Sequence, residues 1–301
     1  MTGPVRLGIL GAGRWAGAHA RAASTVADIE LVGVWARRLE DAARLAQTLG
    51  VRAFDSYEEL ASEVEAFDVC LPPEGQVPIG VAAANRGLHL MLEKPLAPDL
   101  DGARRLRDAC REHQVVSQLM LTRRFSPYTQ EFLARVPDEI GEVDGTSAHY
   151  VHGAFLDPVF ATPWRLRAGV LMDLGPHLFD LLEQVAGRTA EVFAYRSDRD
   201  AVAVTLWHEA GAVSSAILSG SAAGRGAQRL LVFGRAGKLD FDAAHTDENV
   251  ALRAAFAGFA HSVRTGSPTL VDCVRGVELQ AVLDAVQTSL SSGGRVPVPV
   301  A

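Results

Sequence analysis

The segment LMDLGPHLFDLL, residues 171–182, carries three ionisable side chains in an otherwise apolar run. Asp173, His177 and Asp180 are spaced by four and then three residues, so they share one face if the segment is a helix. An imidazole between two carboxylates has two interpretations. Either the stripe faces water, with Asp173 capping or charging the helix start, or it lines a pocket in which His177 transfers protons.

A second candidate catalytic residue lies in the first half of the chain. Lys94 follows the apolar run LHLML and Glu93, and it comes directly before Pro95. This position is the carboxyl end of a predicted strand, where doubly wound sheets bind their ligands. A lysine there can stabilise negative charge on a substrate oxygen, whereas the alternative is an ordinary surface lysine.

A glycine-rich turn predicts what these groups work with. VRLGIL predicts a buried strand, and GAGRWAGAHARAAS predicts a turn and a helix before a second strand, IELVGVW. In GAGRWA, Gly11, Gly13 and Ala16 occupy the positions of the G-x-G-x-x-G/A fingerprint, whose helix start attracts a pyrophosphate. We therefore predict a dinucleotide site, the alternative being a purely structural turn.

The residues after the second predicted strand indicate which dinucleotide binds. NAD sites usually hold an acidic residue here for the ribose hydroxyls. This chain instead has Trp35 near that position, followed by Arg37 and Arg38. Guanidinium groups bind a 2′-phosphate well, so the sequence favours NADP(H) over NAD(H). Two acidic residues at positions 40 and 41 offer the arginines alternative partners.

The elements that must position these residues change character at about residue 122. Up to that point strands and helices alternate, which predicts a doubly wound α/β domain with a parallel sheet over residues 1–122. Residues 123–301 instead contain predicted strands joined by short glycine turns, with helices near 169–187 and 272–290. This second part predicts an α+β domain with an open, mostly antiparallel sheet, and its exposed face favours a homo-oligomer, a dimer or tetramer.

Composition excludes several functions. The 301 residues are 48% hydrophobic and 22% charged, as in a globular chain with a sizeable core. With a net charge of -7 and no basic stripe, nucleic acid is not an expected partner. No apolar run reaches the roughly 18 residues that a membrane helix needs. Cys70, Cys110 and Cys273 form no CxxC pair. We expect a cytoplasmic protein without a signal peptide, with reduced thiols and a small-molecule substrate.

Several segments together resemble the Gfo/Idh/MocA oxidoreductase family. In the family's order they are LGILGAGRWAGAHA, EKPLA at 93–97, TRRFSPY at 122–128, GEV at 141–143 and WRLRAGVLMDLGPHLFDLL at 164–182. EKP followed much later by D-x-G-x-H is far more specific than the glycine motif. The resemblance implies a Rossmann domain followed by an α/β domain whose large sheet mediates oligomerisation. It also implies hydride transfer between a nicotinamide and a carbon bearing a hydroxyl or keto group, usually on a sugar or cyclitol.

The same resemblance implies that Lys94, Asp173 and His177 are catalytic. His177 would exchange the proton of the substrate oxygen, and Lys94 would stabilise negative charge there. Asp173 would orient the substrate or the imidazole, and Asp180 would support His177. We expect no metal, because no ligand cluster beyond the Asp/His pair is evident in the sequence.

The implied binding residues complete the expected site. The family commonly has an Asn and, a few residues later, a His where this chain has Pro73 and Gln76, beside the cofactor. The predicted cofactor-binding residues are Gly11, Gly13, Arg14, Trp15, Ala16, Trp35, Arg37, Arg38, Pro72, Gln76, Glu93 and Lys94. The candidate substrate residues are Arg124, Tyr150, His152, Trp164 and Arg165, each of which also fits a packing or surface role.

Two other functions stay open on the sequence alone. One is a redox-neutral, NAD-using glycosidase in which oxidation is transient. The other is a dinucleotide-sensing regulator without enzymatic activity. Loss of Lys94 or His177 would favour the regulator, and both residues are present.

Overall fold

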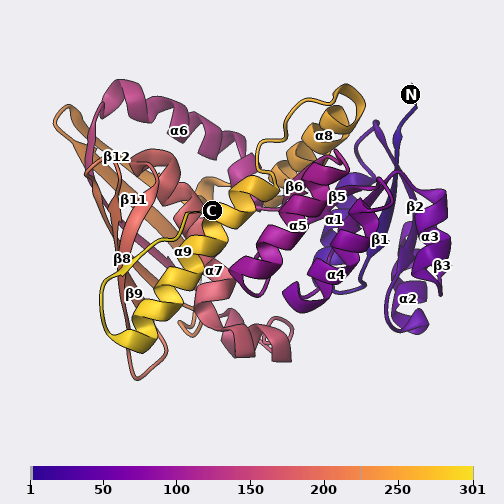
Figure 1. The fold of residues 1–301 in the computed structure, drawn as a ribbon, viewed down its shortest axis with the longest axis horizontal. Coiled ribbons are helices and arrows are strands. Elements are labelled where there is room, and N and C mark those ends of the chain that lie inside the picture. Colours follow the sequence, from indigo (N-terminus) through magenta and orange to yellow (C-terminus); the bar gives the residue numbers. More distant parts are fainter. Residues whose placement is uncertain (1–2, 225, 301) are drawn as a thin grey trace. The chain divides into compact units, whose positions relative to one another are not determined.

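A computed structural model describes residues 3–224 and 226–300, which form two units, each with its own sheet. The first unit contains the residues up to Thr122 together with Glu248–Val277. The second contains Arg123–Asp247 and the residues from Glu278 onward. The two sheets and the helices around them are labelled in Figure 1.

The first unit is built on a six-stranded parallel sheet in the order β3-β2-β1-β4-β5-β6. Its strands are β1 Val5–Leu10, β2 Ile29–Trp35, β3 Arg52–Phe54, β4 Ala66–Val69, β5 His89–Leu92 and β6 Ser117–Leu119. Every residue of β4 is buried, as expected for a strand that is covered on both faces. The strand order reverses between β1 and β4, and doubly wound folds bind their ligands at the carboxyl ends of strands beside such a reversal.

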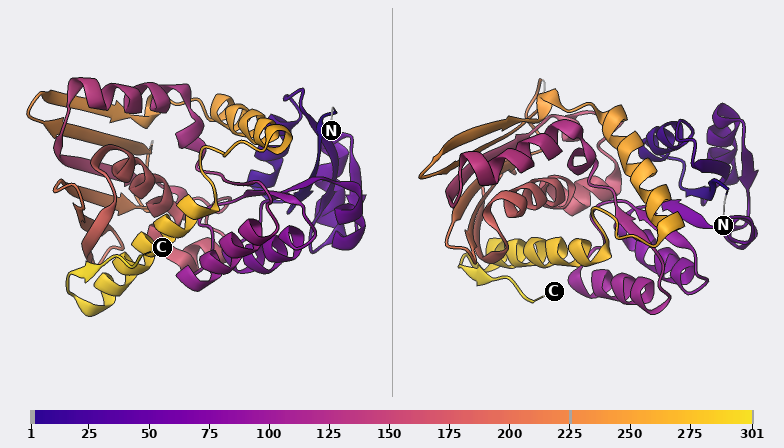
Figure 2. Two further views of the ribbon diagram at one scale, coloured as in Figure 1. Left: turned by 45° about the horizontal axis from the view of Figure 1, so that its top comes forward. Right: turned by 90° about the horizontal axis from the view of Figure 1, so that it is seen from above.

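Helices cover both faces of this sheet. They are α1 Arg14–Ala23, α2 Leu39–Leu49, α3 Tyr57–Glu63, α4 Pro73–Ala84, α5 Leu100–Glu112 and α8 Glu248–Thr265, with the start of α9 Cys273–Ser292. Right-handed crossovers place α1 and α2 on one face, where α8 joins them, and α3, α4 and α5 on the other (Figures 1 and 2). The predicted doubly wound fold is confirmed.

The second unit is built on a seven-stranded sheet in the order β12-β11-β7-β10-β9-β8-β13. Its strands are β7 Val143–Val151, β8 Thr189–Arg196, β9 Val202–His208, β10 Val213–Ser219, β11 Ala227–Gly234, β12 Gly237–Asp242 and β13 Val296–Pro297. Only β7 and β10 pair in parallel among these strands of the described residues. The expectation of an open, mostly antiparallel sheet is therefore confirmed.

One face of the second sheet is covered and the other is not. The helices of this unit are α6 Pro127–Glu139, α7 Pro163–Ala186 and the remainder of α9, joined by short 3-10 turns at Thr122–Phe125, Ala154–Leu156 and Ala243–His245. Helix α7 packs against β7, β9 and β10. The side chains of β9 alternate accordingly: Val202, Val204 and Leu206 are buried, and the residues between them are more exposed.

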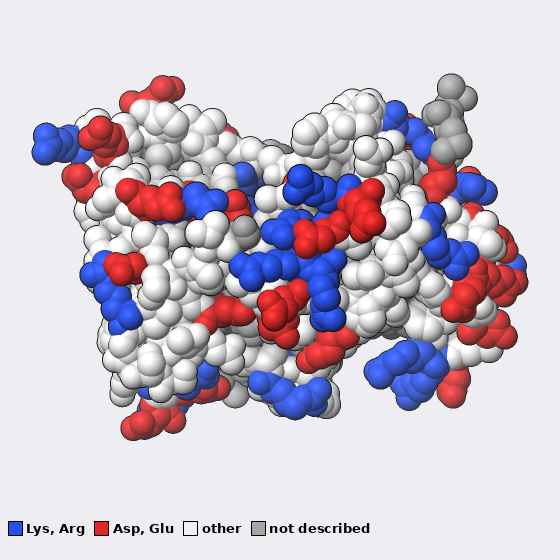
Figure 3. Space-filling view, in the orientation of Figure 1, with Lys and Arg blue, Asp and Glu red and all other residues white. Residues whose placement is uncertain are grey.

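The surface agrees with the charge pattern of the sequence. On the face seen in Figure 3, basic side chains are interspersed with acidic ones rather than gathered into one basic patch. Among the helices of the described residues, none combines the length and the apolarity that crossing a bilayer requires.

Candidate functional site

The turn between β1 and α1 has the features that the glycine motif predicts. Gly11 has φ 114°, and a Cβ on it would stand 2.4 Å from the carbonyl oxygen of Cys70, so only glycine fits here. Gly13 is the N-cap of α1, where a Cβ would meet no atom within 4 Å. The helix begins without a side-chain cap and without an acidic residue in its first turn. The N–H groups of Arg14, Trp15 and Ala16 thus begin a helix whose positive dipole end favours an anion, and the turn fits a dinucleotide phosphate.

The residues expected to select the dinucleotide follow β2. Trp35 ends the strand, and its ring packs edge-on against that of Tyr57, with the ring centroids 6.1 Å apart. Arg37 and Arg38 are both exposed. The Nε of Arg38 donates a hydrogen bond to Asp41 at 2.6 Å, and Arg44 pairs with the same carboxylate. The acidic neighbour anticipated from the sequence therefore does hold one of the two arginines.

Gln76, in α4, holds the segment that carries Lys94. Its side-chain Oε1 accepts a hydrogen bond from the N–H of Glu93 at 2.8 Å. Its Nε2 donates to the carbonyl oxygens of Glu93 at 2.7 Å, Leu96 at 3.0 Å and Pro95 at 3.2 Å. Gln76 is 0% exposed, whereas Pro72 at the N-cap of α4 is half-buried. Gln76 thus acts as a clamp on the backbone around Lys94, at the carboxyl end of β5.

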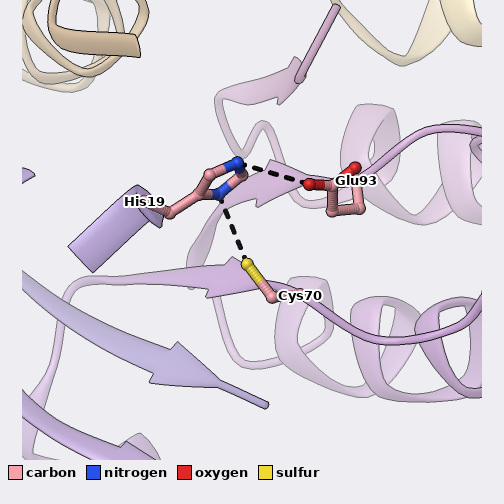
Figure 4. Close-up of side chains that lie close together, drawn as sticks. All are labelled: His19, Cys70 and Glu93. Carbon is pink, nitrogen blue, oxygen red and sulfur yellow. Dashed lines mark hydrogen bonds and ion pairs between the residues drawn. The ribbon is translucent and has the colours of Figure 1, made fainter. Parts of the chain in front are cut away.

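Behind this segment lies a buried ionic cluster that the sequence interpretation missed (Figure 4). His19 of α1 is 0% exposed; its Nδ1 is 3.1 Å from Oδ1 of Asp68, and its Nε2 is 3.3 Å from Oε1 of Glu93. Glu93 Oε2 in turn accepts a hydrogen bond from the N–H of Lys94 at 3.0 Å. Asp68 could have indicated this cluster from the sequence, because a carboxylate within the apolar strand β4 needs a buried partner.

The arrangement explains the charge state of His19. Burial alone lowers the pKa of His19, but the charge of Asp68 and its hydrogen bond, with the charge of Glu93, outweigh burial and raise that pKa to about 9. Burial also raises the pKa of Glu93, which the positive charge of His19 opposes. At neutral pH the imidazole is therefore a cation: its Nδ1 hydrogen-bonds Asp68, and its Nε2 forms an ion pair with Glu93.

The same cluster offers nitrogen, sulfur and oxygen atoms to a metal. One ligand atom each of His19, Cys70 and Glu93 lies within 4.8 Å of the others. However, the Sγ of Cys70 is 3.3 Å from Nδ1, whereas Glu93 faces Nε2 (Figure 4). An ion bound to one ring nitrogen would be turned away from one of the two other ligands. Burial and Asp68 also raise the pKa of the Cys70 thiol, which disfavours the thiolate that metals bind. The geometry favours an ion-paired cluster over a metal centre.

Helix α7 answers the question raised by its polar stripe. Asp173 is 4% exposed and Asp180 is 2% exposed, so the stripe does not face water. The helix is interrupted at Gly169, where φ is 76° and ψ is 175°, and Asp173 lies one turn after this kink. Nε of Arg165, which precedes the kink, lies 3.2 Å from Oδ1 of Asp173, and both side chains are buried. The glycine of the motif has a packing role, because a Cβ on Gly175 would approach Leu283 of α9 to 2.7 Å.

His177 is half-buried and has an aromatic neighbour in the same unit. The ring centroid of Tyr150, on β7, is 6.5 Å from that of His177. Tyr150 also contacts the ring of His152, with centroids 5.6 Å apart, and the guanidinium carbon of Arg123 lies 4.6 Å from the Tyr150 ring centroid. Arg123 is thus a neighbour of this group that the sequence interpretation did not include.

The other predicted substrate residues take mainly structural positions. Arg124 Nε lies 3.2 Å from Oδ2 of Asp180, and Arg124 also donates to Gln184 at 2.5 Å. The guanidinium of Arg165 lies 5.3 Å from the ring centroid of Trp164. Asp180 therefore pairs with an arginine, a partner that the sequence interpretation did not give it, and its predicted support of His177 stays a prediction.

Comparisons with known proteins agree with this architecture. Residues 5–121 match the family model described as "Oxidoreductase family, NAD-binding Rossmann fold", and residues 137–240 match the "GFO/IDH/MocA C-terminal domain". A glucose-6-phosphate 3-dehydrogenase of Bacillus subtilis (strain 168) is 29% identical over 59% of this chain and 52% of its own length. The chain thus spans about half the length of that relative.

Two further proteins are similar over almost the whole chain. A D-xylose 1-dehydrogenase (NADP(+)) of Haloferax volcanii is 27% identical over 89% of this chain and 91% of its own length. The crystal structure of apo scyllo-inositol dehydrogenase from Lactobacillus casei has a TM-score of 0.89 over 99% of both chains, at 17% identity, which is a likeness of fold. Because two models of one family match successive parts of the sequence, the chain belongs to the Gfo/Idh/MocA oxidoreductase family, as its motifs predict.

Proposed function

We propose that the protein is an NADP(H)-dependent oxidoreductase that transfers hydride between the nicotinamide and a hydroxyl- or keto-bearing carbon of a sugar-like or cyclitol substrate. The observation that carries this proposal is that buried polar contacts hold the residues of the family's two motifs in place. Gln76 clamps the backbone on both sides of Lys94, and Arg165 pairs with Asp173 one turn before His177. Residues with only a surface role would need no such support.

The dinucleotide would be held by the β1–α1 turn and the end of β2. The N–H groups at the start of α1, beside Gly13, would bind its phosphates. Arg37 and Arg38 would bind the 2′-phosphate of NADP(H), with Arg38 exchanging Asp41 for the ligand. When bound, the nicotinamide supplies the hydride acceptor or donor. Fluorescence titration of the protein with NADPH and NADH tests the preference, and tighter NADH binding would overturn it.

Proton transfer would fall to His177. In alcohol oxidation His177 accepts the hydroxyl proton, and in ketone reduction it donates that proton to the forming alkoxide. Lys94, as a cation, stabilises the negative charge that develops on the same oxygen. Asp173, held by Arg165, orients the substrate or the imidazole. These three side chains account for the proton and the charge without a metal.

Replacing the two central residues tests the assignment. Lys94→Met and His177→Ala are expected to lower kcat by roughly 10²–10⁴ for whichever sugar or polyol the wild type oxidises, because each removes a group that acts in the transition state. Cofactor binding, followed by NAD(P)H fluorescence, should stay unchanged. Lys238→Met and His261→Ala alter exposed residues and serve as matched controls. Turnover at the wild-type rate in either site variant would remove that residue from the mechanism.

The uncovered face of the second sheet supports a homo-oligomer. Phe193, Tyr195, Val213, Ile217 and Phe233 are 38–62% exposed. The strand register places them on one face, since Tyr195 and Ile217 both pair with Ala203, and Val213 and Phe233 both pair with Gly145. Such an apolar surface is suited to burial against a second copy. Light scattering of the full chain would measure the mass, and a monomer would contradict the proposal. Location in the cytoplasm stays a prediction from the sequence.

A further inference from the structure

A chain of charged side chains runs from strand β4 through helix α1 to the backbone of Lys94. Oδ1 of Asp68 lies 3.1 Å from Nδ1 of His19, and Nε2 of the same ring forms an ion pair with Oε1 of Glu93 at 3.3 Å (Figure 4). The second carboxylate oxygen of Glu93, Oε2, accepts a hydrogen bond from the N–H of Lys94 at 3.0 Å. All four residues belong to the first unit. Glu93 thus joins the imidazole to the peptide group that carries Lys94.

The imidazole of His19 is fixed from several sides. The residue is 0% exposed, and Nδ1 is held by the carboxylate of Asp68. The rings of Trp15 in α1 and Phe256 in α8 lie edge-on to it, with centroids 6.2 Å and 5.7 Å away. Because packing sets the plane of the ring and Asp68 holds one nitrogen, the position of the other nitrogen is determined. The oxygen of Glu93 that pairs with this nitrogen is placed accordingly.

The cluster contributes more to position than to stability. The side chains of His19 and Asp68 are fully buried, and that of Glu93 is 13% exposed. Taking such charges out of water costs about as much free energy as their pairing returns, so an apolar side chain at position 19 could stabilise the fold as well. The positive charge of His19 also opposes the rise that burial causes in the pKa of Glu93. An ionised carboxylate is the stronger acceptor for the N–H of Lys94.

We propose that His19 is a positioning residue for the reaction, which acts through Glu93 to fix the peptide group and hence the side chain of Lys94. This inference rests on the proposed function, because it takes Lys94 as a group that acts on the substrate. The role is distinct from that of the Gln76 clamp, which bonds the peptide groups of the neighbouring residues. The N–H of Lys94 itself is bonded by the carboxylate that His19 holds.

Turnover of the full chain at saturating NADP⁺, with a sugar or polyol that the wild type oxidises, tests the role. His19→Gln should lower kcat by about tenfold or more, because Lys94 is displaced, and should leave NADPH affinity unchanged. His208→Gln is the matched control. His208 is 4% exposed and lies 2.7 Å from both the carbonyl oxygen of Gly187 and Oγ of Ser214, so its loss should lower stability without changing kcat. Rates are compared at a temperature at which circular dichroism shows both variants folded.

A double variant tests the route from His19 to Lys94. Glu93→Gln keeps the shape of the side chain and removes the charge that His19 holds, so kcat should fall by a similar factor. Adding His19→Gln to Glu93→Gln should cost little more, because one residue acts through the other. Losses that multiply in the double variant would show that His19 affects the rate by another route, and they would overturn the inference. A wild-type kcat in His19→Gln would overturn it as well.

Hydrogen exchange gives a measurement that needs no turnover. In peptides that contain Lys94, followed by mass spectrometry, its amide should exchange about tenfold or more faster in His19→Gln than in the wild type or in His208→Gln. Equal exchange in His19→Gln and His208→Gln would contradict the link between His19 and Lys94. Faster exchange in His19→Gln, with no sugar or polyol oxidised by the wild type, would leave that link standing and remove the proposed function.

Discussion

Lys94 and Asp173 are both expected to act in the reaction, yet the protein holds them in different ways. Lys94 lies in a segment that is positioned through its backbone, by the hydrogen bonds of the neutral amide of Gln76. Asp173 is positioned through its own carboxylate, which pairs with the guanidinium of Arg165. A clamp on the backbone positions the segment without using the charge of the Lys94 side chain. An ion pair on the carboxylate neutralises Asp173, which favours orientation over charge as its contribution.

The same helix offers a control for the second arrangement. Asp173 and Asp180 lie on one face of α7, and each is buried against an arginine at 3.2 Å. Only Asp173 belongs to the D-x-G-x-H motif. Each pair joins a buried carboxylate to an arginine at the same distance, and only Asp173 is expected to act in catalysis.

The largest effects are expected from breaking these two ion pairs. Asp173→Asn and Asp180→Asn each leave a buried arginine without its counter-charge, which should lower the free energy of unfolding by about 3 kcal/mol or more. Urea unfolding measures this loss. Among folded molecules, Asp173→Asn should lose kcat/KM by a further tenfold or more, and Asp180→Asn should lose much less. Equal losses of kcat/KM in the two variants would mean that Asp173 has only a structural role.

Breaking the clamp should produce a smaller loss of stability and a clear loss of rate. Gln76→Glu replaces the donor that serves three carbonyl oxygens with a carboxylate, so the free energy of unfolding should fall by about 1–3 kcal/mol. Because Lys94 is displaced, kcat should fall while cofactor affinity stays near that of the wild type.

Two variants sharpen this test. Gln76→His, the residue type usual in the family at this position, should recover most of the rate. Gln47→Glu makes the same chemical change at an exposed site on α2 and should have no effect. A wild-type kcat in Gln76→Glu would show that the clamp is not needed to place Lys94.

Features that depend on neighbouring residues could be predicted from the sequence, whereas contacts between residues far apart along the chain could not. The strands, the helices and the glycine turn were predictable, because hydrophobic periodicity and the φ requirement of Gly11 are local. The role of Gln76 was not, since its partners lie 17 to 20 residues away and the family's usual residue there is different. The cluster at His19 was also missed, because Asp68 is 49 residues from His19 along the chain.

The Arg165–Asp173 ion pair could not be predicted either, although its two residues are close in the sequence. Arg165 and Asp173 are eight residues apart, a spacing that a straight helix does not bring together as neighbours. They pair because the chain turns at Gly169, and a kink inside a merged helical segment left no clear mark in the sequence pattern. Arg124, from another element, also pairs with Asp180, and the sequence pattern did not indicate this partner; the predicted support of His177 by Asp180 stays a prediction.

The smallest expected effect is a pH dependence of the free energy of unfolding, and it arises from the charge of His19 next to the Lys94 segment. The pKa of His19 is about 9 in the folded protein, above the 6.5 of an unperturbed histidine, so folding takes up a proton between these values. The contribution of His19 to stability is therefore complete below pH 6.5 and is lost as the pH rises toward 9. Between pH 6.5 and 8 the free energy of unfolding should fall by about 1–2 kcal/mol.

Urea unfolding at several pH values between 6 and 9 measures this slope. In His19→Gln the slope should disappear whatever the absolute stability of the variant, because glutamine cannot titrate. His261→Gln, at an exposed site, should keep the slope of the wild type. If the slope survives in His19→Gln, the imidazole is neutral between Asp68 and Glu93. The Lys94 segment would then be positioned only by the neutral hydrogen bonds of Gln76. Asp173 in α7, by contrast, is positioned by an ion pair with Arg165.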